Sequence, residues 1–195
     1  MAYAVIKRGS SGNGWFAIAK EDPPFHISAR QLSAWHLSEG QELDERQYQE
    51  IKRLKRRDDC QEKALSLLSM REHTTKELKE KLQARGFFGE DIDPVISQLK
   101  EEGSLDEARY AESMIRSRQR RNPEGKPLLV QRLVAKGISR DEAARAVDAA
   151  FAEQGEAFLS QAVAMARRTT SDQQKLVAKL LRKGFSWSEI KQALS

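Results

Sequence analysis

Apolar residues recur at helical spacing around three glycines in the C-terminal two-thirds of the chain. The glycines are Gly86, Gly137 and Gly184, and a leucine stands four and eight residues before each of them. Leucines at this spacing form one apolar stripe, so the pattern predicts three copies of a helix. Each glycine is expected to end its helix, because a residue without Cβ adopts the left-handed conformation easily. The leucines are Leu78, Leu82, Leu129, Leu133, Leu176 and Leu180.

The residues on either side of these glycines also match between copies. A basic residue precedes each glycine, where it faces the last free carbonyls of the helix, and an apolar residue follows and pins the turn. Apolar residues return six and ten positions after each glycine, which predicts a second helix in every copy. The flanking residues are Arg85, Lys136 and Lys183 before the glycine, and Phe87, Ile138 and Phe185 after it.

Capping motifs mark where further helices begin. Ser139 with Glu142 and Ser186 with Glu189 have the spacing of a capping box, in which serine and glutamate satisfy free amides reciprocally. The first copy has Phe88 at the serine position, so its second helix is expected to begin near Gly89. Two further boxes are expected to begin helices, at Thr74 to Glu77 and at Ser104 to Glu107.

These elements predict a mainly α fold, with an elongated, curved array of three tandem three-helix repeats. The repeats are expected at residues 60–103, 104–152 and 153–195, the third with helices at 157–168, 173–183 and 187–194. Because each helix is short, most of its stability must come from packing against neighbours.

The first 43 residues differ in texture and predict a small β-containing extension. Short β-compatible runs at Ala2–Lys7 and Trp15–Ala19 flank a Gly-rich loop, which favours a hairpin. A third strand is expected around Phe25 and Ile27, and Ser28 is expected to cap a short helix that reaches His36. A linking helix is predicted over residues 44–59, and its charge run from Lys52 to Arg57 is interpreted as a solvated face.

Composition limits the compartment and the class of partner. The chain has 195 residues, a formal net charge of +5 and one cysteine, Cys60, which excludes an internal disulfide and a Cys-rich zinc site. No apolar run could span a bilayer and no signal-peptide core is present, so a cytoplasmic protein is expected. A basic chain favours an acidic partner such as nucleic acid.

The densest positive feature is a cluster of basic residues in the central repeat. Several arginines on one surface would bind DNA phosphates or acidic protein patches in a salt-sensitive manner, although a solvated face is the alternative. Few aromatic residues accompany the cluster, which disfavours reading of base sequence. The cluster consists of Arg116, Arg118, Arg120, Arg121, Lys126, Arg132 and Lys136, opposed locally by Glu112 and Glu124.

No motif predicts catalysis, a cofactor or a metal, so a non-enzyme is expected. His73 shares no motif with the other histidines and is interpreted as a surface or helix-end residue. Trp187 and Phe185 are interpreted as parts of a packed turn. Tyr110 is interpreted as a core residue rather than a contact residue.

At several of these positions the chain resembles the RecX family of recombinase regulators. Arg71-Glu72-His73-Thr74 and Arg85-Gly86-Phe87 look like parts of its first repeat, Arg109-Tyr110-Ala111 and Lys136-Gly137-Ile138 like its central repeat, and Lys183-Gly184-Phe185 like its third. The resemblance implies an all-helical, crescent-shaped protein that binds RecA recombinase filaments on single-stranded DNA and limits strand exchange and filament growth. Glu124 stands where an aromatic residue is frequent in the family.

The hypothesis that follows is a monomeric regulator without chemistry of its own, which binds the RecA filament and single-stranded DNA, with double-stranded DNA as a further ligand bound without sequence preference. A stand-alone helix-turn-helix DNA reader is the alternative, but helix 139–150 is Ala-rich and is expected to be buried. An enzyme is the third candidate. The expected filament or DNA contacts are Arg71, Arg109, Arg116, Arg118, Arg120, Arg121, Lys126, Arg132 and Lys136.

Overall fold

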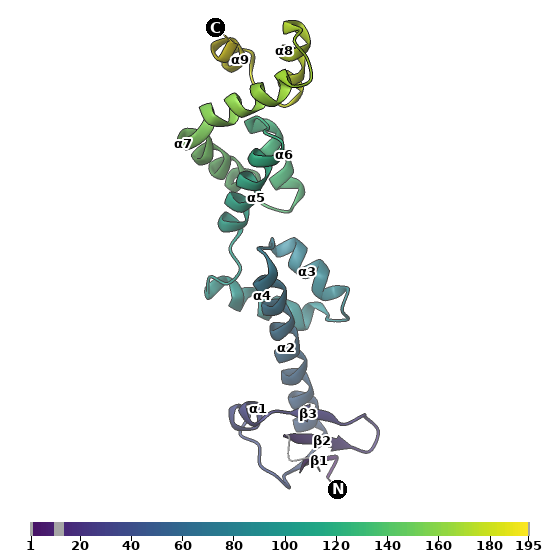
Figure 1. The fold of residues 1–195 in the computed structure, drawn as a ribbon. Helices are drawn as coiled ribbons and strands as arrows, with labels where there is room; N and C mark the ends of the chain where they lie inside the picture. The colour runs from purple at the N-terminus through teal and green to yellow at the C-terminus, as the bar shows by residue number, and fades with distance from the viewer. Residues whose placement is uncertain (1, 10–13, 195) are drawn as a thin grey trace. The chain divides into compact units, whose positions relative to one another are not determined.

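The computed structural model describes residues 2–9 and 14–194, which are mainly helical with a small sheet near the N-terminus (Figure 1). The chain divides into two compact units. The first comprises residues 1–63 with 86–95, and the second comprises residues 64–85 with 96–195. Two helices, α2 and α4, contribute residues to both units.

The sheet of the first unit is antiparallel, with strand order β3-β2-β1-β4. Its strands confirm the predicted hairpin and third strand, while residues 10–13 of the predicted loop lie outside the described residues. The strands are β1 (Ala4–Arg8), β2 (Trp15–Ala19), β3 (Phe25–Ile27) and β4 (Glu42–Leu43).

Alternating residues of these strands bury one face of the sheet. Ile6, Ala17 and Ile27 are fully buried, and α2 (Glu45–Met70) supplies Tyr48 and Ile51 to the same core. The short helix α1 (Ala29–Ala34) begins as predicted at a complete capping box formed by Ser28 and Gln31.

The charge run of α2 is more than a solvated face, so that interpretation is wrong. Lys52 forms an ion pair with Asp22 at 2.7 Å. Arg56 donates to the buried Asp91 carboxylate at 2.8 Å, and its guanidinium lies 5.3 Å from the centre of the Phe88 ring. These contacts could not be predicted from the local sequence, because the partners lie 30 and 35 residues apart along the chain.

Helices fill the second unit. They are the C-terminal parts of α2 and of α4 (Gly89–Glu101), followed by α3 (Thr75–Gln83), α5 (Glu107–Arg121), α6 (Lys126–Ala135), α7 (Arg140–Arg167), α8 (Gln173–Arg182) and α9 (Trp187–Leu194).

The repeated glycines end helices as predicted. Gly86, Gly137 and Gly184 have φ values of +85°, +95° and +83°, which place them in the left-handed region. Ser139 and Ser186 also cap helices as predicted, because each hydroxyl accepts the amide of the glutamate three residues later.

The box predicted at Ser104 is wrong. The N-cap of α5 is Asp106, whose carboxylate accepts the amides of Ala108 and Arg109 at 2.8 and 3.0 Å. The Glu107 carboxylate accepts the amide of Thr75 instead. Asp106 directly precedes α5, so its carboxylate reaches the free amides of the first turn, whereas Ser104 lies two residues further from the helix.

The predicted break between the second and third repeats is absent. One helix of 28 residues, α7, covers the expected helices 139–150 and 157–168 and the segment between them. Gly155 lies within this helix without ending it. An isolated glycine costs a helix only about 1 kcal/mol, and the packing of α7 against α5, α6 and α8 compensates.

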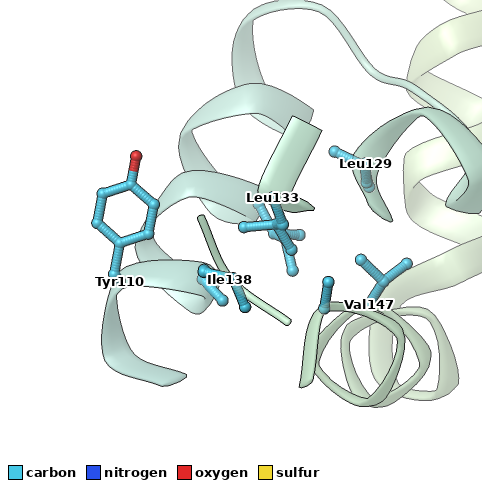
Figure 2. Close-up of a cluster of buried hydrophobic side chains, with 8 residues drawn as sticks. Tyr110, Leu129, Leu133, Ile138 and Val147 are labelled. Carbon is cyan, nitrogen blue, oxygen red and sulfur yellow. The ribbon is translucent and has the colours of Figure 1, made fainter. Parts of the chain in front are cut away.

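The core of the central repeat lies where α5, α6 and α7 meet (Figure 2). Leu129, Leu133 and Val147 are fully buried there, and Tyr110 and Ile138 complete the labelled cluster. The predicted core position of Tyr110 is therefore confirmed.

Two glycine turns contact the N-terminus of an earlier helix in the second unit. The Lys136 carbonyl oxygen accepts the Thr74 hydroxyl at 2.8 Å, and the Lys183 carbonyl oxygen accepts the Gly125 amide at 2.8 Å. Thr74 and Gly125 are the N-caps of α3 and α6. The carbonyl oxygen of the residue before the glycine thus accepts a hydrogen bond from the N-cap of an earlier helix in both cases, once from a hydroxyl and once from a backbone amide.

Candidate functional site

The nine expected contact residues all lie in the second unit, and most of them are engaged within it. Five anchor buried or half-buried acidic side chains, and Lys126 pairs with the exposed Asp148. Arg116, Arg120 and Arg121 form no ion pair among the described residues. The pairs are Arg71 and Lys136 with Glu77, Arg118 and Arg132 with Glu124, and Arg109 with Glu72.

Glu124 is the centre of the strongest cluster. The residue is only 3% exposed, and both its carboxylate oxygens accept from Arg132, at 2.5 and 2.8 Å. Arg118 donates to the same carboxylate at 2.6 Å. Burial would raise the pKa of Glu124, but the hydrogen bonds from Arg132 and Arg118 outweigh it and lower the pKa. Glu124 is therefore an internal anchor rather than a contact residue.

The loop around Glu124 is held on two further sides. The buried Gln119 side chain exchanges two hydrogen bonds with the Glu124 backbone, at 2.8 and 2.9 Å. The Lys183 ammonium donates to the Asn122 amide oxygen at 2.7 Å. A Cβ on Gly125 would lie 2.0 Å from the Gly184 carbonyl oxygen, so only glycine fits there.

Glu77 is the second acidic centre. It accepts from Lys136 at 2.7 Å and from Arg71 at 3.0 Å, and Tyr110 donates to it at 3.5 Å. Burial acts to raise its pKa, but the hydrogen bonds from Lys136 and Arg71 prevail and lower the pKa to about 2. The carboxylate thus stays charged and joins α3 to the end of α6.

Arg109 holds the connection between α4 and α5. Its guanidinium donates to the carbonyl oxygens of Gly103 and Ser104, both at 3.1 Å, and to the Glu72 carboxylate at 2.5 Å. With these donors in use, Arg109 has a structural task, and its predicted contact with DNA or the filament stays a prediction.

A basic groove on one side of α5 brings three of the expected residues together. It has a volume of about 320 Å³ and is lined by Arg71, Arg118 and Arg121, with the hydroxyls of Ser113 and Ser117 between them. Its other lining residues are Glu72, Tyr110 and Met114. Guanidinium forks and hydroxyl donors are the groups that bind phosphate oxygens.

The remaining arginines of α5 lie elsewhere. Arg116 lines a second groove, between α5 and α7, and Arg120 lines neither groove. Helical spacing explains why Arg118 and Arg121, three residues apart, share the basic groove while Arg120 lies outside it. The four arginines of the cluster on α5 are thus divided between different sides of that helix, and Lys126, Arg132 and Lys136 belong to α6 and its C-cap.

The anchoring roles of Glu77 and Glu124 and the serines of the groove were not predicted from the sequence. Ser113 and Ser117 are four residues apart and in helical register with Arg121, and this spacing could have placed them on one side. Glu77 was expected only as part of a helix cap, because its partner Lys136 lies 59 residues away along the chain.

Two interpretations of single elements were wrong, and a third was correct in part. His73 lies at a helix end as expected, directly before Thr74, the N-cap of α3, but it is 2% exposed rather than on the surface, and burial lowers the pKa of its imidazole. Phe185 is buried as expected, but Trp187, the first residue of α9, is 60% exposed. The helix expected at 139–150 is buried only along Ala143 and Val147, while its other side is polar and exposed.

Within residues 2–9 and 14–194, no three or more His, Cys, Asp or Glu side chains are arranged to hold a metal ion. Over the same ranges, no helix has the length and apolar character needed to cross a membrane.

Family models match two segments of the chain. The model described as "RecX, first three-helix domain" matches residues 60–99, and the model described as "RecX, second three-helix domain" matches residues 106–147. These segments contain the first and second of the repeated glycines.

Curated relatives cover most of the chain. The "Regulatory protein RecX" of Pelodictyon phaeoclathratiforme is 35% identical over 134 residues, which cover 67% of this chain and 84% of the relative. The protein of the same name from Vibrio vulnificus is 35% identical over 144 residues, covering 70% of this chain and 91% of the relative.

Solved structures share the fold. The structure titled "Crystal structure of regulatory protein RecX" matches with a TM-score of 0.77 at 21% identity, covering 100% of this chain and 99% of that one. The structure of RecX from Lactobacillus salivarius matches with a TM-score of 0.61 at 23% identity, covering 72% of this chain and 96% of that one. At these identities the likeness concerns the fold.

Replacing Glu124 by alanine is expected to lower the free energy of unfolding by about 2–3 kcal/mol, because two arginines and a buried loop lose their common partner. Urea denaturation measures the change. Glu156→Ala, at an exposed position of α7, is the control and is expected to stay within about 0.5 kcal/mol of the parent. Equal losses in the two variants would contradict the anchoring role.

Glu77 is expected to stabilise the fold in a pH-dependent manner. Its pKa in the folded state, about 2, lies below the reference value of 4.5. The contribution is therefore complete above about pH 4.5 and is lost as the pH falls towards 2. The free energies of unfolding of the parent and of Glu77→Gln should differ most at pH 7 and converge near pH 2. A difference independent of pH would contradict the charged pairing.

Proposed function

The chain belongs to the RecX family of regulatory proteins, and on that premise we propose that it binds filaments of RecA recombinase on single-stranded DNA. Binding restrains the filament, so that ATP hydrolysis, strand exchange and filament growth slow down. The protein acts in the cytoplasm, in DNA repair, homologous recombination and the SOS response, as a monomer and without catalysing a reaction.

The observation that carries this proposal is the basic groove of α5. Three arginines from two segments of the chain line it, together with two serine hydroxyls. Such donors suit the phosphates of a DNA backbone and do not distinguish bases. Arg121 is the principal candidate contact, because it is exposed and has no ion-pair partner among the described residues.

The other expected residues contribute to DNA binding in different ways. Arg116, Arg120 and Lys126 are exposed and supply charge around the site. Arg71 and Arg118 contact DNA with the donors that their internal carboxylates leave unused. Arg109, Arg132 and Lys136 support the loops, and their proposed contribution to DNA binding is through the local field.

A stand-alone helix-turn-helix reader of DNA is less well supported. Its recognition helix would be the first part of α7, whose exposed side carries Asp141, Glu142 and Asp148 beside Arg140 and Arg145. Carboxylates on that side would repel the phosphates that flank a groove of DNA. The negative charge of this side, and not its burial, argues against a helix-turn-helix reader.

The function is tested with RecA filaments on single-stranded DNA. We expect the rates of ATP hydrolysis and strand exchange to fall when the protein is added at stoichiometric levels. The readout is the rate with and without the protein at a fixed salt concentration. Unchanged rates at equal amounts of the two proteins would reject the proposal.

Replacing Arg121 by alanine is expected to weaken binding to single-stranded DNA. The slope of log affinity against log salt should fall by about 0.7, the value for one lost phosphate contact on a single strand. Fluorescence anisotropy over a series of salt concentrations measures both quantities. Arg120→Ala removes the same charge from the neighbouring position outside the groove and is expected to lower the slope by less than Arg121→Ala does. The same slope in both variants would show that the groove is not the DNA site.

A further inference from the structure

A second groove lies between α5 and α7, on a different side of α5 from the basic groove. Its volume is about 640 Å³, twice that of the basic groove. Small apolar side chains make up much of its lining, which lets a helix backbone approach closely. These residues are Ala108, Ala111, Ala146, Ala149 and Ala150, and the larger apolar residues of the lining are Ile115, Ile138 and Phe158.

The charged residues of this groove are mainly acidic, although the chain as a whole is basic. Four carboxylates line it, from Glu107, Glu112, Glu142 and Glu153, against the two guanidinium groups of Arg116 and Arg145. A groove with excess negative charge repels nucleic acid and attracts a basic partner. The two grooves along α5 are therefore suited to partners of opposite charge.

Two of the four carboxylates have tasks within the fold. Glu107 accepts the Thr75 amide at 3.0 Å, and Glu142 belongs to the capping box of Ser139. Glu112 and Glu153 are exposed, and neither forms an ion pair among the described residues. These two carboxylates are available to an incoming lysine or arginine.

We propose that this groove binds a helix of the recombinase with small apolar side chains on one face and lysine or arginine residues at its edges. The inference rests on the proposed function and deepens it. DNA occupies the basic groove of α5, and the recombinase protein occupies the groove between α5 and α7. The orientation of α5 on the filament follows from the two contacts together.

The test uses the full chain with two groove variants and a matched control for each. The double variant Glu112→Lys with Glu153→Lys reverses the available charges, and its control is the double variant Glu101→Lys with Glu156→Lys, which makes the same change in net charge at exposed positions outside this groove. Ala149→Trp fills the groove from an exposed position, and its control is Ala164→Trp, an exposed position of α7 that does not line it. Circular dichroism and urea denaturation verify that each variant is folded.

Binding is measured by fluorescence anisotropy to filaments assembled on labelled single-stranded DNA with a slowly hydrolysed ATP analogue, and separately to the DNA alone. Both groove variants should bind the filament about tenfold more weakly or worse, while their affinity for DNA alone stays equal or rises. The controls should bind both targets like the parent.

Failure of this inference is distinct from failure of the proposed function. A parent that does not bind the filament contradicts the function itself. A parent that binds, with groove variants that bind equally well, overturns the groove assignment alone. Loss of binding to DNA alone in the groove variants would also overturn the groove assignment, because DNA would then be the ligand of the groove. Dimerisation of the parent through this groove, seen in sedimentation, would overturn it too, because a second copy would then occupy the groove.

Discussion

A buried carboxylate fixes the positive part of the second unit. Glu124 is almost fully buried, and a buried charge is costly unless it is paired and hydrogen-bonded, so the fold requires Arg118 and Arg132 beside it. The next residue, Gly125, lies against the turn that ends α8, where no side chain would fit. The burial of Glu124 therefore fixes three features together: the path of the loop, the position of Arg118 and the place where the turn after α8 packs.

This constraint explains why net charge is a poor guide to the contact surface. Most of the expected basic residues serve acidic partners inside the unit, so they shape the site more than they present free charge. The helical spacing of α5 decides on which side of the helix each remaining basic side chain lies. Arg121 lies in a groove with hydroxyl donors, whereas Arg116 lies among carboxylates in the groove between α5 and α7. The surface of α5 is thus divided by charge.

The sequence predicted the features that local chemistry determines. Helix ends at Gly137 and Gly184, caps at Ser139 and Ser186, and the N-terminal hairpin follow from a few neighbouring residues. The continuity of α7 was missed because its compensation comes from helices packed against it, and the anchors Glu77 and Glu124 were missed because their importance depends on tertiary contacts. The division into five segments and the nine contact residues remain predictions.

We propose that α5 faces DNA on one side and the recombinase on another. Site-specific photocrosslinking within the assembled filament tests this arrangement most directly, with a photoreactive side chain placed at Ser117 in the basic groove or at Ala149 in the groove between α5 and α7. We expect the probe at position 117 to crosslink to DNA and the probe at position 149 to crosslink to the recombinase. Crosslinks from both positions to the same partner, or from neither to the filament, would contradict it.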